Sequence, residues 1–247
     1  MHDTGETMAS ENVLDQPRHL LPVLIVAKSA TSSQLRQVFM AIGFNQISTS
    51  SGYRAALADA KENRPKIVFF DDDLGEDGAD ALTKYKFVSA IQALVRDVVI
   101  VALSQNATGE EMFNLMKVGC KAFLVPPCNA GAVEGVFLQI RDGGEISKEL
   151  LHAEDRTGAF LEYIIRRLDW LASDLKSKPN GAGVDERIKG FRNLVQMATF
   201  FCESQEPPFA ERAVEVLIQH AEDLDKMAAQ TRLRKTREML RAQRGKS

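Results

Sequence analysis

The chain has 247 residues, of which 45% are hydrophobic and 26% charged, and its formal net charge is −3. These values are typical of a globular protein with room for one large domain or two modest ones, and the charge favours no particular partner. The three cysteines, Cys120, Cys128 and Cys202, are odd in number and lack CxxC or Cys/His metal-ligand spacing, which suits a reducing cytoplasm better than a disulfide framework. No apolar run approaches the roughly 20 residues that a membrane-spanning helix needs.

The first 18 residues are predicted to be a flexible leader. They carry four acids against Arg18 and few apolar side chains that could be buried. They also lack the basic and apolar regions of a secretion signal, so we expect a cytoplasmic protein.

From residue 19 to 142, strand-like and helix-like segments alternate. Strands are predicted at residues 22–27, 46–50, 67–70, 98–103 and 122–125, and helices at residues 32–42, 52–63, 79–94, 109–118 and 130–141. Thr31 or Ser32 can cap the first helix, Gly43 can end it, and Thr108 can cap the fourth. This alternation predicts an α/β domain with a doubly wound five-stranded parallel sheet.

Residues 148–245 are predicted to form an all-α module of three helices. Their apolar residues recur at helical spacing and form three stripes. The stripes are Phe160, Ile164, Leu168, Leu171 and Leu175; Phe191, Leu194, Met197, Ala198 and Phe201; and Val214, Leu217, Ile218, Ala221, Leu224 and Met227. Because the stripes are wide enough to pack against each other or against a second copy of the chain, we expect a homodimer that forms through residues 156–245. Trp170 is expected in the core of the module.

The third predicted strand ends in a cluster of carboxylates. Lys66–Gly78 reads KIVFFDDDLGEDG, so that Asp71, Asp72 and Asp73 follow a buried apolar run. Open α/β sheets place reactive groups at the carboxyl ends of their strands, where a crevice forms. This edge of the sheet is therefore the candidate functional site.

Residues of about 20–142 resemble the receiver domain of bacterial two-component response regulators. The resemblance rests on Ser48–Asp73 (STSSGYRAALADAKENRPKIVFFDDD) and on Gly119–Pro127 (GCKAFLVPP), together with the strand that ends in acids. It implies a flavodoxin-like fold with strand order 2-1-3-4-5.

The same resemblance implies a phosphoryl-accepting pocket, and this chain departs from it. Receivers phosphorylate an aspartate after the third strand, which corresponds to Asp71, and bind Mg²⁺ with two acids after the first strand. Ala27 and Lys28 stand at the acid positions, and Pro126 stands where a lysine is expected, whereas the hydroxyl position is retained as Ser104. Without these acids Mg²⁺ loses most of its oxygen ligands.

The sequence therefore predicts a degenerate phosphoacceptor pocket made of Asp71, Asp72, Lys28, Ser104 and Pro126, with no metal, no cofactor and no catalytic residue. Lys28 is expected to pair with Asp71 or Asp72 and to lower the pKa of that carboxyl group. Asp72 and Asp73 otherwise fit a polar loop at the edge of the sheet.

In receivers the fourth helix, the fifth strand and the fifth helix form the usual docking face for partners. The matching residues, which make up the candidate partner face, are Met112, Phe113, Met116, Phe123 and Cys128.

The leading hypothesis is a non-enzymatic bacterial signalling or scaffold protein, a phosphorylation-independent pseudo-receiver that binds protein partners. One alternative is a regulator that binds RNA or DNA through the helical module, because Thr231–Ser247 carries seven basic residues against one acid. Met197–Ala221 is also faintly similar to the RNA-binding unit of transcription antiterminators. The other alternative is an active response regulator that is phosphorylated at Asp71.

Overall fold

The computed structural model describes residues 13–74, 82–142, 146–177 and 184–223, together with residues 226 and 230. The chain forms two compact units, Met1–Leu151 and His152–Ser247. The acids of the predicted loop at 75–81, the basic stretch Thr231–Ser247, and Leu224 and Met227 of the third stripe lie outside the described residues.

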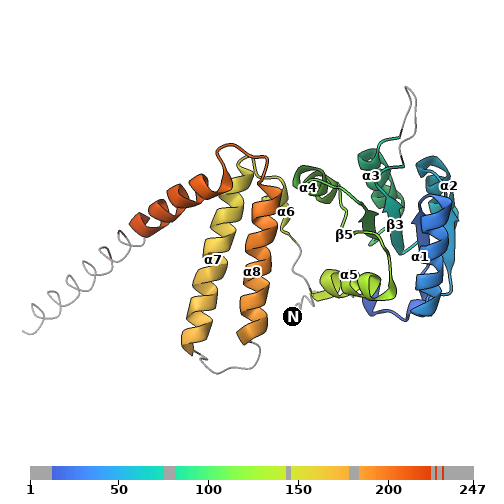
Figure 1. The fold of residues 1–247 in the computed structure, drawn as a ribbon, viewed down its shortest axis with the longest axis horizontal. Helices are drawn as coiled ribbons and strands as arrows, with labels where there is room; N and C mark the ends of the chain where they lie inside the picture. The colour runs from blue at the N-terminus through green and yellow to red at the C-terminus, as the bar shows by residue number, and fades with distance from the viewer. Residues whose placement is uncertain are drawn as a thin grey trace, which may run out of the picture. The chain divides into compact units, whose positions relative to one another are not determined.

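The first unit is built on a five-stranded parallel sheet of order β2-β1-β3-β4-β5 (Figure 1). The strands are β1 (Val23–Val26), β2 (Ile47–Ser50), β3 (Ile67–Asp71), β4 (Val99–Leu103) and β5 (Ala122–Leu124). Pairing is parallel at every step, with Val26 opposite both Ser50 and Phe70, and Asp71 opposite Leu103. The predicted fold and strand order are confirmed.

Five helices cover the two faces of this sheet, and a sixth follows them. They are α1 (Ser29–Ala41), α2 (Tyr53–Asn63), α3 (Lys84–Leu94), α4 (Gly109–Lys117), α5 (Ala130–Asp142) and the short α6 (Lys148–Leu151). The described part of α3 begins at Lys84, capped by Thr83, rather than at residue 79 as predicted.

Each face of the sheet has its own hydrophobic core. On one face, Phe69 of β3 packs with Phe39 of α1 and Phe137 of α5. On the other face, Phe70 packs with Tyr53 of α2 and Phe87 of α3. Because successive strand residues point to opposite faces, Phe69 and Phe70 of β3 each belong to a different core.

The helix ends agree only in part with the sequence. Thr108 and Glu111 form the capping box of α4, and Gly43 after α1 has φ +97°, as a helix-ending glycine often does. The predicted cap of α1 is wrong, because the helix begins at Ser29 after Lys28. Ser32 instead donates its hydroxyl to the backbone oxygen of Ala27, 2.9 Å away.

The predicted flexible leader extends too far along the chain, because its last residues are packed. Val13 is buried in the core, and Arg18 donates two hydrogen bonds to Glu134 of α5 and one to the backbone oxygen of Ile42. Arg18 also lies over the ring of Phe44. Residues 13–18 therefore belong to the packed unit, and residues 1–12 lie outside the described part of the chain.

The second unit consists of α7 (Arg156–Ser177), α8 (Val184–Phe201) and a helix over residues 209–223. Phe160 of α7 is fully buried against Phe201 of α8, and the guanidinium of Arg156 donates to the backbone oxygen of Phe201. Trp170 is not in the core as predicted: its side chain is half exposed, with the guanidinium of Arg167 over its ring. Among the described residues, no helix is long and apolar enough to span a bilayer.

Candidate functional site

The third strand places Asp71 at the carboxyl edge of the sheet, as predicted. The backbone there is tightly held: Asp72 N donates to Leu103 O at 3.0 Å, and the Tyr53 hydroxyl donates to Asp71 O at 2.8 Å. The Asp71 carboxylate accepts the backbone N–H of Asp73 at 3.1 Å. The tip of β3 is thus fixed by its neighbours β4 and α2.

Asp72 is the buried carboxylate of the site, not the polar loop residue that the sequence predicted. Its side chain is 9% exposed and continues the face of the sheet that Val68 and Phe70 cover. Ser104, which the receiver resemblance assigns to the phosphoryl group, is itself buried, and its hydroxyl helps to stabilise the charged form of Asp72.

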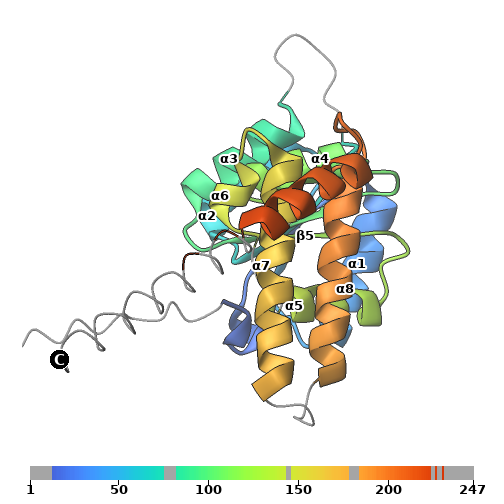
Figure 2. The same ribbon diagram turned by 90° about the vertical axis from the view of Figure 1, so that its left-hand side faces the viewer.

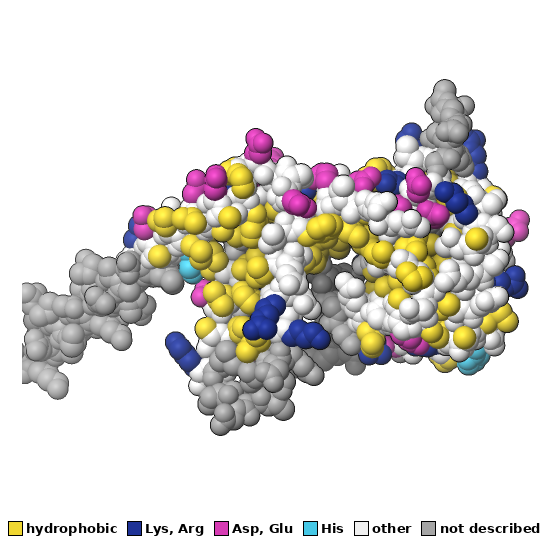
Figure 3. Space-filling view, in the orientation of Figure 1, with side chains coloured by type: hydrophobic (Ala, Val, Ile, Leu, Met, Phe, Trp, Pro, Cys, Tyr) yellow, Lys and Arg dark blue, Asp and Glu magenta, His cyan; other side chains and the backbone are white. Residues whose placement is uncertain are grey.

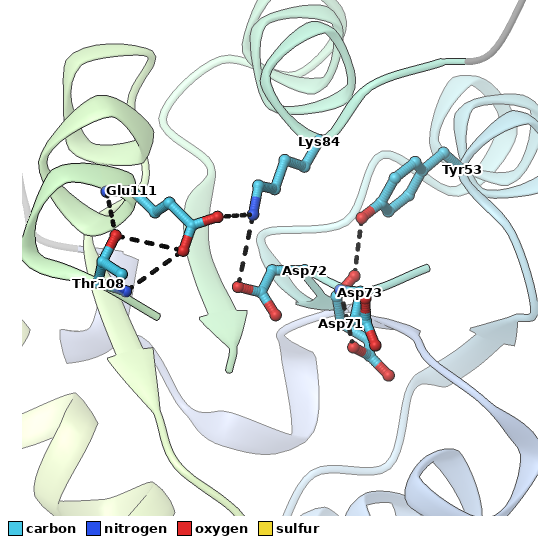
Figure 4. A network of polar contacts seen from close by, with 7 residues as sticks. All are labelled: Tyr53, Asp71, Asp72, Asp73, Lys84, Thr108 and Glu111. Atoms are coloured by element: carbon cyan, nitrogen blue, oxygen red, sulfur yellow. Dashed lines mark hydrogen bonds and ion pairs between the residues drawn. The ribbon is translucent and has the colours of Figure 1, made fainter. Parts of the chain in front are cut away.

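Lys84, at the first position of α3, supplies a positive charge to Asp72. Its ammonium group lies 3.8 Å from Asp72 Oδ2 and 3.1 Å from Glu111 Oε1 of α4, and its side chain is 20% exposed. Figure 4 shows Asp72 turned toward Lys84, whereas the carboxylates of Asp71 and Asp73 point away from it. Lys84, Asp72 and Glu111 form a network that joins the end of β3 to α3 and α4; we name it the Lys84 network.

The two acids of this network have opposite pKa shifts. Burial raises the pKa of Asp72, and the hydrogen bond from Ser104 and the charge of Lys84 offset only part of that effect. The backbone N–H of Thr108 and the ammonium of Lys84 lower the pKa of Glu111. The Lys84 network is thus held in place by Glu111, whose charge is well stabilised, while Asp72 has a reduced preference for the charged form.

The prediction that Lys28 pairs with Asp71 or Asp72 is wrong. Lys28 precedes α1, its side chain is 65% exposed, and its nearest carboxylate oxygen is Asp73 Oδ2 at 4.0 Å. A pair between two exposed groups at this distance contributes little. The lysine that reaches the buried acid is Lys84, which the sequence analysis did not single out.

The residues at this edge do not fit the Mg²⁺ that a receiver would hold there. Ala27 is buried and has no oxygen ligand in its side chain, and Lys28 brings a positive charge. Pro126, joined to Pro127 by a cis peptide bond, offers no ammonium group for a phosphoryl oxygen. In the part of the chain that the structure describes, no three His, Cys, Asp or Glu side chains are arranged to hold a metal ion.

The candidate partner face is only partly at the surface. Phe113 and Cys128 are each 1% exposed, and Cys128 belongs to the core that contains Phe69, so neither side chain is available to a partner in this structure. Met112, Met116 and Phe123 are partly exposed, and Phe123 packs against the core of α2, α3 and α4. Of the predicted five residues, these three can contribute to a surface.

The chain's own α6 lies against this region. It packs on α4, and its residues Leu150 and Leu151 are buried. The Ser147 hydroxyl accepts the N–H of Leu150 and so caps the short helix. Part of the surface of α4 is therefore covered within the first unit.

No protein-family model and no curated protein matches the chain. Among solved structures, a chemotaxis response regulator of Vibrio cholerae is 20% identical, over 49% of this chain and 98% of that one, with a TM-score of 0.43. A receiver domain protein of Clostridium thermocellum is 17% identical, over 50% and 95% of the two chains, with a TM-score of 0.42. The signal receiver domain of a modulated diguanylate cyclase of Desulfovibrio desulfuricans is 20% identical, over 50% and 99%, with a TM-score of 0.41. These likenesses concern the fold.

Proposed function

We propose that this protein works in bacterial signalling as a non-enzymatic adaptor. Its receiver-like unit binds protein partners without being phosphorylated, and its helical unit carries the output. The proposal rests on what the side chains at the carboxyl edge of the sheet can and cannot do.

The observation that carries the proposal is the Lys84 network. An acyl phosphate in a receiver is stabilised by cations and by a hydroxyl that bind its oxygens. Here the ammonium of Lys84 lies 3.8 Å from an oxygen of Asp72 and 3.1 Å from one of Glu111, and Ser104 is buried. The positive charge of Lys84, which a phosphoryl group on Asp71 would need, is already paired with the chain's own carboxylates.

The missing metal ligands support the same conclusion. A carboxylate attacks a phosphoryl donor only if the developing negative charge is offset. Ala27 and Lys28 provide no oxygen for Mg²⁺, and Pro126 provides no positive charge. The Lys84 network forms between side chains of the chain itself and needs no bound ligand. We therefore expect the receiver-like unit to keep one conformation.

We infer that a receiver-like unit of this kind acts by binding other proteins. Met112, Met116 and Phe123 are partly exposed, and Val125, next to β5, is 57% exposed. Methionines adapt their shape to a partner at low cost. We expect a partner to bind at this surface, beside the part that α6 covers.

Incubation with acetyl phosphate and Mg²⁺, followed by intact-mass measurement, tests the proposal. A conventional receiver domain serves as the positive control, and Asp71→Asn as the negative control. We expect the wild-type chain and Asp71→Asn to gain no phosphoryl mass under conditions that label the control domain. Stoichiometric labelling that Asp71→Asn abolishes would establish the active response regulator instead.

Nucleic-acid binding remains a prediction from the basic stretch Thr231–Ser247, which lies outside the described residues. A gel shift with RNA and DNA at low salt tests it, because binding through phosphate contacts weakens steeply as salt is added.

A further inference from the structure

The helix over residues 209–223 presents one face to α7. Its partly buried residues recur on this face and include Arg212, Val216 and His220. Arg212 pairs with Asp155 at 2.9 Å, and His220 Nε2 lies 3.4 Å from Asp169 Oδ2 of α7. Figure 2 shows this helix, in red-orange, crossing α7. The two contacts, eight positions apart in the sequence, fix the rotation of the helix about its axis.

A second face of the same helix is apolar and exposed. We name it the outer seam; its residues are Ala210, Val214, Leu217, Ile218 and Ala221. Val214, Leu217 and Ile218 are 57%, 52% and 57% exposed. Figure 3 shows hydrophobic side chains gathered over this end of the second unit. Large aliphatic side chains that recur on one face and remain exposed usually mark a contact surface.

The spacing of the outer seam is that of a helix that pairs with another helix. Ala210, Val214, Leu217 and Ala221 follow one another at intervals of four, three and four residues. This is the a/d spacing that brings side chains of two helices into register. The alternation of small and large residues also allows the two backbones to approach closely.

The described charged residues beside the seam are mostly acidic, with Glu211, Glu215, Glu222 and Asp223 against Arg212 and Lys226. Glu215 pairs with Arg212 at 2.7 Å, and Lys226 lies 4.0 Å from Glu222 and 3.1 Å from Asp223. No charged side chain belongs to the seam itself. Among the described residues of this surface, a nucleic acid would meet more acidic than basic side chains, so its phosphates would be repelled.

We propose that the outer seam binds the outer seam of a second copy of this chain, which makes the protein a homodimer. A second copy brings the same uncharged, apolar seam at the same helical spacing, so the contact is self-complementary about a twofold axis. This proposal specifies where the expected dimer forms, and it does not depend on the proposed function of the receiver-like unit.

The seam is short. Fifteen residues of helix extend over about 22 Å, so the contact buries less than the roughly 800 Å² per partner of a standard interface. However, the helix is already held by the pair of Arg212 with Asp155, so pairing does not have to fold it. We therefore expect a weak dimer whose population changes between about 1 µM and about 1 mM.

Sedimentation of the full chain across that concentration range tests the proposal. We compare the wild type with Leu217→Glu and with a matched control, Leu138→Glu, since Leu138 of α5 is 48% exposed. We expect the dimer fraction of the wild type and of Leu138→Glu to rise with protein concentration. Leu217→Glu should stay monomeric up to concentrations at least tenfold higher than those at which the wild type dimerises. A wild-type chain that is monomeric throughout, or a Leu217→Glu variant that dimerises like the control, would overturn the proposal.

Cysteine crosslinking provides a second test if Leu217→Glu perturbs folding. The three native cysteines are buried, so an introduced cysteine is the accessible thiol. Val214→Cys and Leu217→Cys are oxidised separately, with Leu138→Cys as the control. A disulfide-linked dimer from at least one seam variant and none from the control supports the proposal, and equal yields or no dimer from either seam variant contradict it.

Discussion

Replacing Lys84 by Met removes the positive charge of the Lys84 network and keeps most of the methylene chain. Lys84 is 3.8 Å from a carboxylate oxygen of Asp72 and 3.1 Å from one of Glu111. After the substitution, the largely buried Asp72 has lost the positive charge beside it. The expected result is a less stable receiver-like unit at neutral pH.

The magnitude follows from the exposure of the two acids. Glu111 is 41% exposed, so its pair with Lys84 contributes about 0.5 kcal/mol, as exposed pairs do. Asp72 is 9% exposed, and a largely buried carboxylate that loses its cation costs about 2 kcal/mol. Together these predict a loss of about 2–3 kcal/mol in the free energy of unfolding.

Hydrogen exchange measured on peptides from β3 and β4 gives this quantity for the first unit alone. The single tryptophan, Trp170, lies in the second unit, so its fluorescence during urea denaturation reports on that unit separately. A whole-chain transition would mix the two units and would not yield a defined free energy.

Lys86→Met is the matched control, because Lys86 is exposed and two residues farther along α3. We expect Lys86→Met to change the free energy of unfolding, measured by hydrogen exchange in β3, by less than about 0.5 kcal/mol. In Lys84→Met/Asp72→Asn, the total loss should be smaller than the sum of the two single losses, since the buried charge is gone. Equal effects of Lys84→Met and Lys86→Met would refute the reasoning.

Three further predictions concern single contacts. Tyr53→Phe deletes the hydroxyl that donates to Asp71 O at 2.8 Å, and it should cost about 1 kcal/mol in the exchange of β3. In a carboxyl NMR titration, Asp72 should titrate above 3.8 and Glu111 below 4.5. The charge of Asp72 therefore opposes folding at neutral pH, and this cost disappears as the pH falls through its folded pKa. The contribution of Glu111 is present above its unfolded pKa and is lost only as the pH falls through its lower folded value. Phe160→Ala removes a fully buried ring and should cost about 3–5 kcal/mol in the unfolding followed by tryptophan fluorescence; an unchanged midpoint would contradict the packing described for the second unit.

The first unit was predictable because its strands are buried on both faces. Runs such as the one ending at Phe70 are apolar without alternation, which distinguishes a parallel sheet from a half-exposed one. The cap of α4 was predictable from Thr108, because a capping box is a local pattern of four residues. The cap of α1 was not, since Ser32 bonds a carbonyl that only the turn after β1 brings near it.

The Lys84 network was missed because its members come from three parts of the fold, the end of β3, α3 and α4. Lys28 directly follows β1, so proximity in the sequence favoured it as the partner of the acids. The start of α3 also lies at the carboxyl edge of the sheet in this topology, and that rule could have pointed to Lys84. No pattern in the sequence distinguishes its ammonium, which is 20% exposed, from that of exposed Lys86 two positions later.

The apolar stripes of the second unit predicted helices but not which faces are buried. Phe160 and Leu217 belong to stripes of similar spacing, yet the first is fully buried and the second is 52% exposed. Periodicity identifies an apolar face and does not say whether the same chain or another one covers it.

The central claim is that the carboxyl edge of the sheet cannot assemble a phosphoryl site, and binding of beryllofluoride with Mg²⁺ tests it most directly. Backbone amide resonances of Asp71, Asp72 and Ser104 are followed by NMR during titration with Mg²⁺, alone and with beryllofluoride. The account predicts no saturable shift of these resonances at millimolar Mg²⁺. Saturable shifts at micromolar Mg²⁺, confined to these residues and their neighbours, would contradict it.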